Sequence, residues 1–241
     1  MDELKKYFDD FEIHARVMPV LVTSLPLIIV LLWNGIIADD CLESAIYLLI
    51  YMVALTFANK IARNLGKKCE KKMYEKLGGK PTTIVLRFSD DTFDEVTTKR
   101  YHEKLNQFAG LKLPLNSAQE RKRDDQQYDS AINALRNYAN DNRDKEPRVY
   151  QELKDYNFWR NLYGIKPFAV VFYGLLAIRC YFAIPIFSLQ KMFLSPVPDY
   201  VEFLVMVIAI SLFLVFVTQN VVKEKSFDYA KALVEVCERL P

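Results

Sequence analysis

The residues that could carry out chemistry in this chain are few and widely spaced. The chain has 2 histidines, His14 and His102, and neither belongs to a spacing typical of a metal site or a Ser-His-Asp arrangement. Residues 79–82 (GKPT) superficially resemble a phosphate-binding loop. That loop needs another glycine where Tyr74 stands, and an amide N–H where Pro81 has none. We therefore expect no enzyme, no metal and no cofactor.

Basic and aromatic side chains in the middle of the chain could bind an anion instead. Between residues 63 and 164, 21 Lys and Arg outnumber 16 Asp and Glu. Basic residues mixed with aromatic rings can hold single-stranded nucleic acid through phosphate contacts and base stacking, but a solvated charged face has the same composition. For His102, a surface or packing role is the alternative. The candidate ligand contacts are Arg87, Lys99, Arg100, Tyr101, His102, Arg121, Lys122 and Arg123.

Four apolar segments frame this polar region, at residues 17–37, 42–61, 167–189 and 203–222. Each is close to the ~20 residues with which a helix crosses a bilayer. Lys and Arg are frequent between residues 60 and 76, absent between the first two segments, and represented by Lys191 alone between the last two. Because flanks rich in Lys and Arg stay in the cytoplasm, both termini and the middle domain are predicted to be cytoplasmic.

The predicted fold is therefore a mainly α integral membrane protein, with four transmembrane helices in two hairpins that flank a helical cytoplasmic domain with one short strand. Residues 1–16 suit an amphipathic helix on the membrane surface, with a polar leader as the alternative. The parts that follow are a hairpin at 17–62, a cytoplasmic ligand and assembly domain at 63–164, a second hairpin at 165–222 and a cytoplasmic C-terminal helix at 223–241.

Within the cytoplasmic domain, the pattern predicts one strand and three helices. Residues 82–88 alternate between apolar and polar, which is typical of a strand, and this strand would need a partner at 111–115 or in a neighbouring subunit. Capping boxes that begin at Thr92 and Ser117 predict the starts of two helices. Pro147 predicts the first turn of the third helix.

Polar residues inside the apolar segments indicate a pore or a gate. Such side chains can line an aqueous path in an oligomer, or they can form hydrogen bonds between helices. Arg179 lies well inside the third segment, where an arginine either faces protein or water or snorkels toward the outer headgroups. The candidate pore or gating residues are Thr56, Asn59, Arg179, Thr218 and Asn220.

Short motifs across residues 81–167 carry a resemblance to a known family. They are PTT at 81–83, LR at 86–87, DT at 91–92, TTKRYH at 97–102 and NFWRNLYGIKP at 157–167. The last of these is the more specific. This pattern resembles the channel-forming membrane effector subunits of Hailong-type bacterial anti-phage defence systems.

The resemblance implies a homo-oligomeric ion channel, such as a tetramer, in the bacterial inner membrane, whose partners are lipid, further copies of the chain and a single-stranded DNA oligomer. It implies that a partner nucleotidyltransferase makes the oligomer, which holds the channel closed. Loss of the oligomer would then depolarise the membrane and cause growth arrest or death. The alternative is a non-conducting membrane scaffold that anchors a cytosolic defence enzyme. The residues expected to couple the domain to its spans are Asn157, Arg160, Asn161, Gly164, Lys166 and Pro167.

Overall fold

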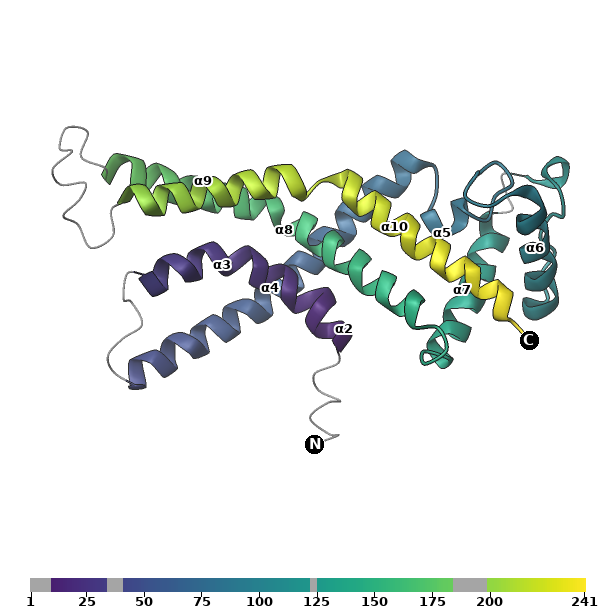
Figure 1. Ribbon diagram of the computed structural model, residues 1–241, viewed down its shortest axis with the longest axis horizontal. Coiled ribbons are helices and arrows are strands. Elements are labelled where there is room, and N and C mark those ends of the chain that lie inside the picture. Colours follow the sequence, from purple (N-terminus) through teal and green to yellow (C-terminus); the bar gives the residue numbers. More distant parts are fainter. Residues whose placement is uncertain (1–9, 34–40, 122–124, 184–198) are drawn as a thin grey trace. The chain divides into compact units, whose positions relative to one another are not determined.

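The computed structural model describes residues 10–33, 41–121, 125–183 and 199–241. Within them the chain is mainly helical and forms two compact units (Figure 1). Unit 1 is Met1–Cys69 with Asn157–Val221, and unit 2 is Glu70–Tyr156 with Val222–Pro241. Two of the unit boundaries fall inside the long helices α4 (Cys41–Leu77) and α8 (Pro147–Ala183), so each of these helices contributes to both units.

Unit 1 contains α3 (Met18–Trp33), the first part of α4, the second part of α8 and α9 (Asp199–Phe216). The chain enters α3 through α2 (Asp10–Glu12) and a π-helical turn (Ile13–Val17). The predicted N-terminal helix is therefore helical from Asp10 onward, and it continues without a break into the first apolar segment. Residues 1–9 of that predicted helix lie outside the described part of the chain.

Helices α8 and α9 lie side by side and run in opposite directions (Figure 1). Toward one end of the pair, Cys180 Sγ donates a hydrogen bond to Glu202 at 3.7 Å. Toward the other end, Lys166 Nζ donates to the carbonyl oxygen of Val217 at 2.8 Å. The core of unit 1 includes buried apolar residues from both helices, among them Ala169, Tyr173, Ala177, Met206, Ala209 and Phe213.

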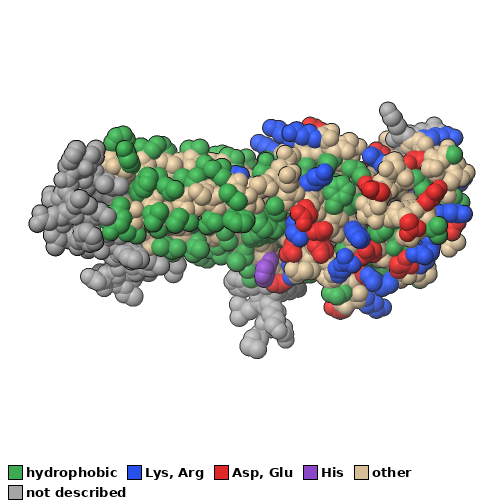
Figure 2. Space-filling view, turned by 45° about the horizontal axis from the view of Figure 1, so that its top comes forward, with side chains coloured by type: hydrophobic (Ala, Val, Ile, Leu, Met, Phe, Trp, Pro, Cys, Tyr) green, Lys and Arg blue, Asp and Glu red, His purple; other side chains and the backbone are tan. Residues whose placement is uncertain are grey.

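Much of the surface of unit 1 is apolar. Leu49 on α4 is 65% exposed and Val171 on α8 is 63% exposed. Of the large apolar side chains that are exposed in the described residues, only Val96, Phe108 and Leu115 belong to unit 2. Figure 2 shows hydrophobic side chains over the visible face of unit 1, whereas Lys, Arg, Asp and Glu gather over unit 2. Soluble monomers rarely leave so much contiguous apolar surface in water, so this surface suits lipid.

Two helical stretches are long and apolar enough to cross a membrane, Asp10–Val30 and Pro147–Phe182. A third results if the bent pair Tyr200–Phe216 and Gln219–Arg239 forms one span. These helices indicate a membrane protein, as the sequence predicts. Four spans in two hairpins stay a prediction, because the helices counted among the described residues do not include the second apolar segment, 42–61, which is part of α4.

Helices α4 and α8 cross at a point in unit 1 where their backbones touch. A Cβ atom added to Gly164 would lie 2.3 Å from the backbone nitrogen of Gly66 and 2.9 Å from the carbonyl oxygen of Ala62. A Cβ atom on Gly66 would lie 2.8 Å from the carbonyl oxygen of Arg160. Only glycine permits so close an approach, as in other membrane helix crossings built from small residues. Helix α8 is continuous through this crossing and through Pro167.

Unit 2 is built from shorter helical elements: α5 (Pro81–Ile84), α6 (Glu95–Ala109), α7 (Asp125–Asp141), the start of α8, most of α10 (Gln219–Val234), and 3-10 turns at Ser117–Gln119 and Glu235–Arg239. Its enclosed core includes the aliphatic residues Leu105, Ile132, Leu135, Leu233 and Val236. Charge fixes the C-terminal turn, because the buried carboxylate of Glu146 accepts a hydrogen bond from Arg239 Nε at 2.6 Å. Arg148 also pairs with Glu235 at 2.6 Å.

The strand predicted at residues 82–88 is wrong. The described part of the chain contains no strand, and this segment forms the single helical turn α5 followed by tight turns. Pro81 occupies the first helical position, where its fixed φ favours a helix start. The amide groups of Thr83 and Ile84 then both donate to the carbonyl oxygen of Lys80 at 2.9 Å. Residues 82 and 83 are both buried, so the alternation in the sequence does not correspond to the two faces of a strand.

The three predicted helices of this domain are present, two of them with shifted starts. Helix α6 begins after Asp94 rather than Thr92, because the Asp94 side chain accepts the hydrogen bond that caps the helix. Ser117 opens only a short 3-10 turn, and α7 starts at Asp125. Pro147 is the first residue of α8, as predicted.

We expect Gly164→Ala to lower the stability of the protein by about 1–3 kcal/mol, because the added methyl group meets backbone atoms of α4. Gly174→Ala is the matched control, since it lies on the same helix and a Cβ atom there meets nothing within 4 Å. Alanine at 174 should stabilise the helix by up to about 1 kcal/mol. Thermal unfolding of both variants in detergent micelles tests this, and equal shifts would contradict the backbone contact.

Candidate functional site

A pocket of about 440 Å³ lies in unit 2. The turns after α5, the segment between α6 and α7 and the first turn of α7 all contribute to it. Its lining residues are Gly78, Arg87, Ser89, Glu120, Arg121, Asp125 and Tyr128. Two predicted ligand contacts, Arg87 and Arg121, are therefore brought together although they are distant in the chain.

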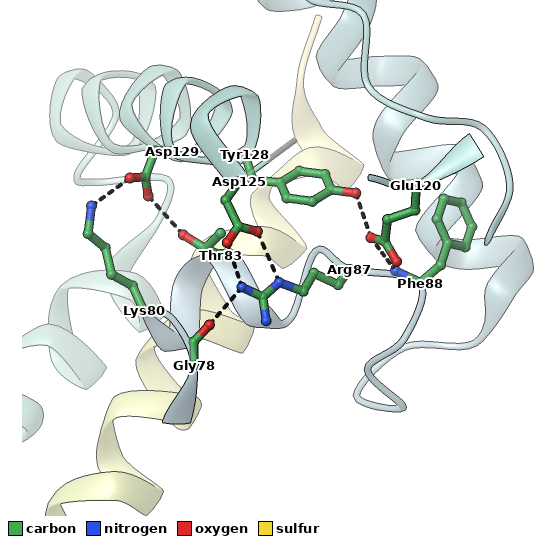
Figure 3. A network of polar contacts seen from close by, with 9 residues as sticks. All are labelled: Gly78, Lys80, Thr83, Arg87, Phe88, Glu120, Asp125, Tyr128 and Asp129. Atoms are coloured by element: carbon green, nitrogen blue, oxygen red, sulfur yellow. Dashed lines mark hydrogen bonds and ion pairs between the residues drawn. The ribbon is translucent and has the colours of Figure 1, made fainter. Parts of the chain in front are cut away.

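The guanidinium group of Arg87 is held by two partners (Figure 3). Its Nε and one terminal nitrogen donate to the Asp125 carboxylate at 3.1 and 2.7 Å, which is the two-pronged geometry that arginine and carboxylate favour. The same terminal nitrogen donates to the carbonyl oxygen of Gly78 at 3.0 Å. The side chain is 22% exposed, so it forms part of the pocket wall with its charge already partly neutralised.

The backbone beside Arg87 is anchored by His102, a fully buried residue of α6. Its Nε2 lies 2.7 Å from the carbonyl oxygen of Leu86, and its Nδ1 lies 2.6 Å from the carbonyl oxygen of Pro114. A neutral imidazole has one N–H and donates to only one of these two oxygens. The imidazole thus connects three segments of unit 2, one of which carries Arg87.

Aromatic rings enclose His102 and set its protonation. The ring of Phe88 approaches it edge-on at 5.1 Å between centroids, and the ring of Tyr128 lies at 5.5 Å. Burial lowers the pKa of His102, and the two carbonyl oxygens and Glu120 oppose this shift without reversing it. His102 is therefore a buried packing residue behind the pocket rather than a group that a ligand touches.

Glu120 fixes a second part of the pocket wall (Figure 3). Its Oε1 accepts hydrogen bonds from the hydroxyl of Tyr128 at 2.7 Å and from the backbone N–H of Phe88 at 3.1 Å. The ring of Tyr128 is buried, so its hydroxyl serves Glu120 and its face does not offer a stacking surface to a ligand.

A second ion pair ties α5 to α7 (Figure 3). Lys80 Nζ and Thr83 Oγ1 donate to the carboxylate of Asp129 at 2.7 and 2.8 Å. Burial would raise the pKa of Asp129, but these hydrogen bonds and the positive charge of Lys80 together lower it. The carboxylate is therefore ionised at neutral pH and keeps the two helices joined.

The pocket wall thus contains both signs of charge, with Arg87 and Arg121 facing Glu120 and Asp125. Such a wall suits a ligand that brings an anionic group to the arginines and hydrogen-bond donors to the acids. Among the described residues, no group of three or more His, Cys, Asp or Glu could hold a metal ion.

The other predicted ligand contacts on α6 do not line this pocket. Arg100 pairs with Glu238 at 2.5 Å. Tyr101 is buried, and this burial raises its pKa to about 12. Lys99 is exposed and lies 4.0 Å from Glu103. Lysine and arginine on this helix therefore form ion pairs on its surface rather than one binding site.

Several predicted coupling residues lie at the crossing of α4 and α8. The buried Asn161 donates through Nδ2 to the carbonyl oxygen of Ala15 at 2.7 Å. The buried Arg160 donates to Asn161 Oδ1 from two nitrogens, at 3.4 and 3.3 Å. Gly164 makes the backbone contact described above, while Asn157 is half-buried on the same helix. These residues tie α8 to the neighbouring elements of unit 1.

Two predicted residues have contacts at the break between α9 and α10: the coupling residue Lys166 and the gating residue Thr218. Lys166 Nζ donates to the carbonyl oxygen of Val217 at 2.8 Å. Thr218 Oγ1 accepts from the backbone N–H of Val221 at 3.4 Å, which caps the start of α10. Asn220 is exposed beside it.

The remaining predicted pore residues have different environments. Thr56 is exposed and donates to the carbonyl oxygen of Met52 at 2.9 Å. The Oδ1 atom of Asn59 is buried and has no hydrogen-bond partner within the described residues. Arg179 is exposed on α8 among apolar side chains, and no ion pair joins it to another described residue.

Sequence reasoning missed the acidic half of the pocket. Asp125 is the second of two aspartates that follow the basic run 121–123, and only the basic residues of that run were expected as ligand contacts. No local pattern indicates that Asp125 pairs with Arg87, because this contact depends on how α5 and α7 pack. Lys122 and Arg123 lie outside the described residues.

We expect the stability of the protein to fall as the pH drops below about 6.5, in part because of His102. The folded state keeps its pKa below the ordinary value of 6.5, so the unfolded state binds more protons there and protonation favours unfolding. His102→Gln should be less stable at pH 7 but should lose less additional stability between about pH 7 and 5. Thermal melts of both proteins across this range check the slope, and parallel pH profiles would refute the assignment.

Comparisons of the chain with protein-family models, curated proteins and solved structures find no match. The function proposed below therefore rests on the chain's own residues and on the resemblance of residues 81–167 described above. The two features that carry this inference are the arginine-containing pocket of unit 2 and the apolar surface of unit 1.

Proposed function

We propose that this chain is a ligand-gated, ion-conducting membrane effector whose polar unit 2 binds an anionic ligand. The observation that carries the proposal is the convergence of Arg87 and Arg121 on one pocket of about 440 Å³. Support also comes from the helices α4 and α8, which are continuous between the apolar unit 1 and unit 2. A ligand bound by one unit could thereby act on helices that belong to the other.

The proposed ligand is a single-stranded DNA oligomer made by a partner nucleotidyltransferase, as the resemblance of residues 81–167 implies. Its phosphates would contact Arg87 and Arg121, because arginine forms strong paired hydrogen bonds with phosphate. Asp125 competes with the ligand for Arg87, since the carboxylate already occupies two of its nitrogens. Phosphate contact alone carries no sequence preference.

The proposed membrane arrangement has four spans in a bacterial inner membrane, with both termini and unit 2 in the cytoplasm. Several copies of the chain, such as four, would enclose a pore lined in part by Thr56, Asn59, Thr218 and Asn220. The exposed positions of Thr56 and Asn220 are compatible with this role. Opening of the pore would depolarise the host membrane during phage infection and cause growth arrest or death.

Purified protein in liposomes tests conduction directly. We expect ion flux that changes when a single-stranded oligodeoxynucleotide is added to the side that unit 2 faces. Gating requires that the ligand bind the open and closed states with different affinity, so binding without any change in flux would count against gating. Absence of flux under every condition would favour the alternative of a non-conducting scaffold that anchors a cytosolic enzyme.

Substitutions at the pocket wall test the binding site. Arg121→Ala should weaken binding of a labelled oligodeoxynucleotide by about tenfold, because a charge-assisted phosphate contact is lost. Asp125→Asn should strengthen binding, because it removes a negative charge that competes for Arg87.

The matched control for these variants is Lys99→Ala, which removes one positive charge from α6 outside the pocket. Fluorescence anisotropy at fixed salt concentration measures all three affinities, since phosphate binding depends strongly on salt. If Lys99→Ala weakened binding as much as Arg121→Ala, the ligand would be held by general charge and not by this pocket.

A further inference from the structure

The C-terminal end of α9 is followed by a break in the helical path of unit 1, and the second half of α9 is almost entirely apolar. Helix α9 ends at Phe216 and α10 begins at Gln219. The last carbonyl groups of any α-helix lack partners within the helix and carry a partial negative charge. In an apolar surrounding, each such group must find another partner.

The side chain of Lys166 is the hydrogen-bond donor to two of these carbonyl groups. Its Nζ lies 2.8 Å from the carbonyl oxygen of Val217 and 3.5 Å from that of Leu214. The N–H of Val217 reaches the carbonyl oxygen of Phe213 at 3.3 Å, and the N–H of Thr218 reaches that of Phe216 at 3.2 Å. The carbonyls of Leu214 and Val217 thus receive an ammonium group, whereas those of Phe213 and Phe216 receive an amide.

This arrangement has the chemistry of a cation site. Backbone carbonyls at the C-terminal end of a broken membrane helix are known ligands for small monovalent cations. Lys166 is half-buried and Val217 is buried, so the contact with Val217 is partly shielded from solvent. An ammonium group carries three N–H donors and a compact charge, so at direct contact with carbonyl oxygens it resembles a monovalent cation that has lost its hydration shell.

We propose that the C-terminal end of α9 is a site for a small monovalent cation, and that the ammonium group of Lys166 is its tethered occupant. Removal of the lysine side chain leaves the carbonyls of Leu214 and Val217 open to a free cation such as an alkylammonium ion. The site itself depends only on contacts within unit 1. Its effect on conduction, as a fixed positive charge beside the predicted pore residues Thr218 and Asn220, rests on the proposed function.

The test uses chemical rescue of Lys166→Ala in the full-length protein, in detergent, with hydrogen exchange as the measurement. We expect the backbone amides of residues 217–221 to exchange about tenfold faster in this variant than in the native protein, because a charge-assisted contact that holds the break is lost. Methylammonium should restore slow exchange, whereas choline at the same ionic strength should not, because it is too large and lacks N–H donors. Lys166→Arg should stay close to the native protein.

Lys223→Ala is the control variant, because Lys223 is a nearby lysine on α10 whose charge lies over the ring of Phe227 at 5.9 Å. It should show neither faster exchange at 217–221 nor any response to methylammonium. Native exchange rates in Lys166→Ala would show that the ammonium group of Lys166 does not hold the break between α9 and α10. Faster exchange with no response to methylammonium, or an equal response to choline, would overturn the cation site. Because conduction is not measured, failure of the proposed channel leaves this test unaffected.

Discussion

The backbone contact between Gly66 and Gly164 is the constraint on which much of the structure depends. It fixes the point at which α4 and α8 cross, because a side chain at either position would collide with main-chain atoms of the other helix. The same two helices associate again within unit 2, by hydrogen bonds instead of close packing. There the hydroxyl of Tyr74 on α4 lies 2.9 Å from that of Tyr156 on α8, and it donates to Glu70 at 3.0 Å. Each unit therefore has its own means of holding the pair.

The need to satisfy main-chain polar groups explains several features of unit 1. A chain with an apolar surface has few side-chain partners to offer, so those that it has are placed where helices end or bend. Asn161 donates to the carbonyl oxygen of Ala15, just before α3, and Lys166 donates to carbonyls at the end of α9. Thr218 accepts from the first turn of α10. The polar residues that the sequence marks as pore or coupling groups therefore also have a structural role.

The sequence predicts the elements of this fold better than it predicts their contacts. Apolar length identifies the two or three helices that can cross a membrane among the described residues, and Pro147 marks the start of α8, because both signals are local. The strand at 82–88 fails for a local reason as well, since the helical start at Pro81 and the hydrogen bonds to Lys80 override the alternation.

The contacts within the candidate site could not be predicted from local sequence patterns. Arg87 and Arg121 are recognisable as basic residues, but their convergence depends on the packing of α5, α6 and α7. Helical spacing could have separated the buried His102 from the exposed Lys99 on α6, because the buried residues of this helix recur at intervals of three and four. Asp125 carries no such signal. Its role follows only from the distance to Arg87.

The state of Arg87 limits how a ligand could act on unit 2. Its guanidinium is already paired with Asp125, at the first turn of α7, so an anion that binds Arg87 in full must replace this carboxylate. The exchange would release the first turn of α7 from the turn after α5, while the bond between Lys80 and Asp129 keeps the next turn of α7 attached. A bound anion would therefore shift the start of α7 and leave the rest of the helix in place. A ligand drives that change only if its contacts with Arg87 and Arg121 release more free energy than the contact between Asp125 and Arg87 does. A shift between two states requires that the ligand bind them with different affinity.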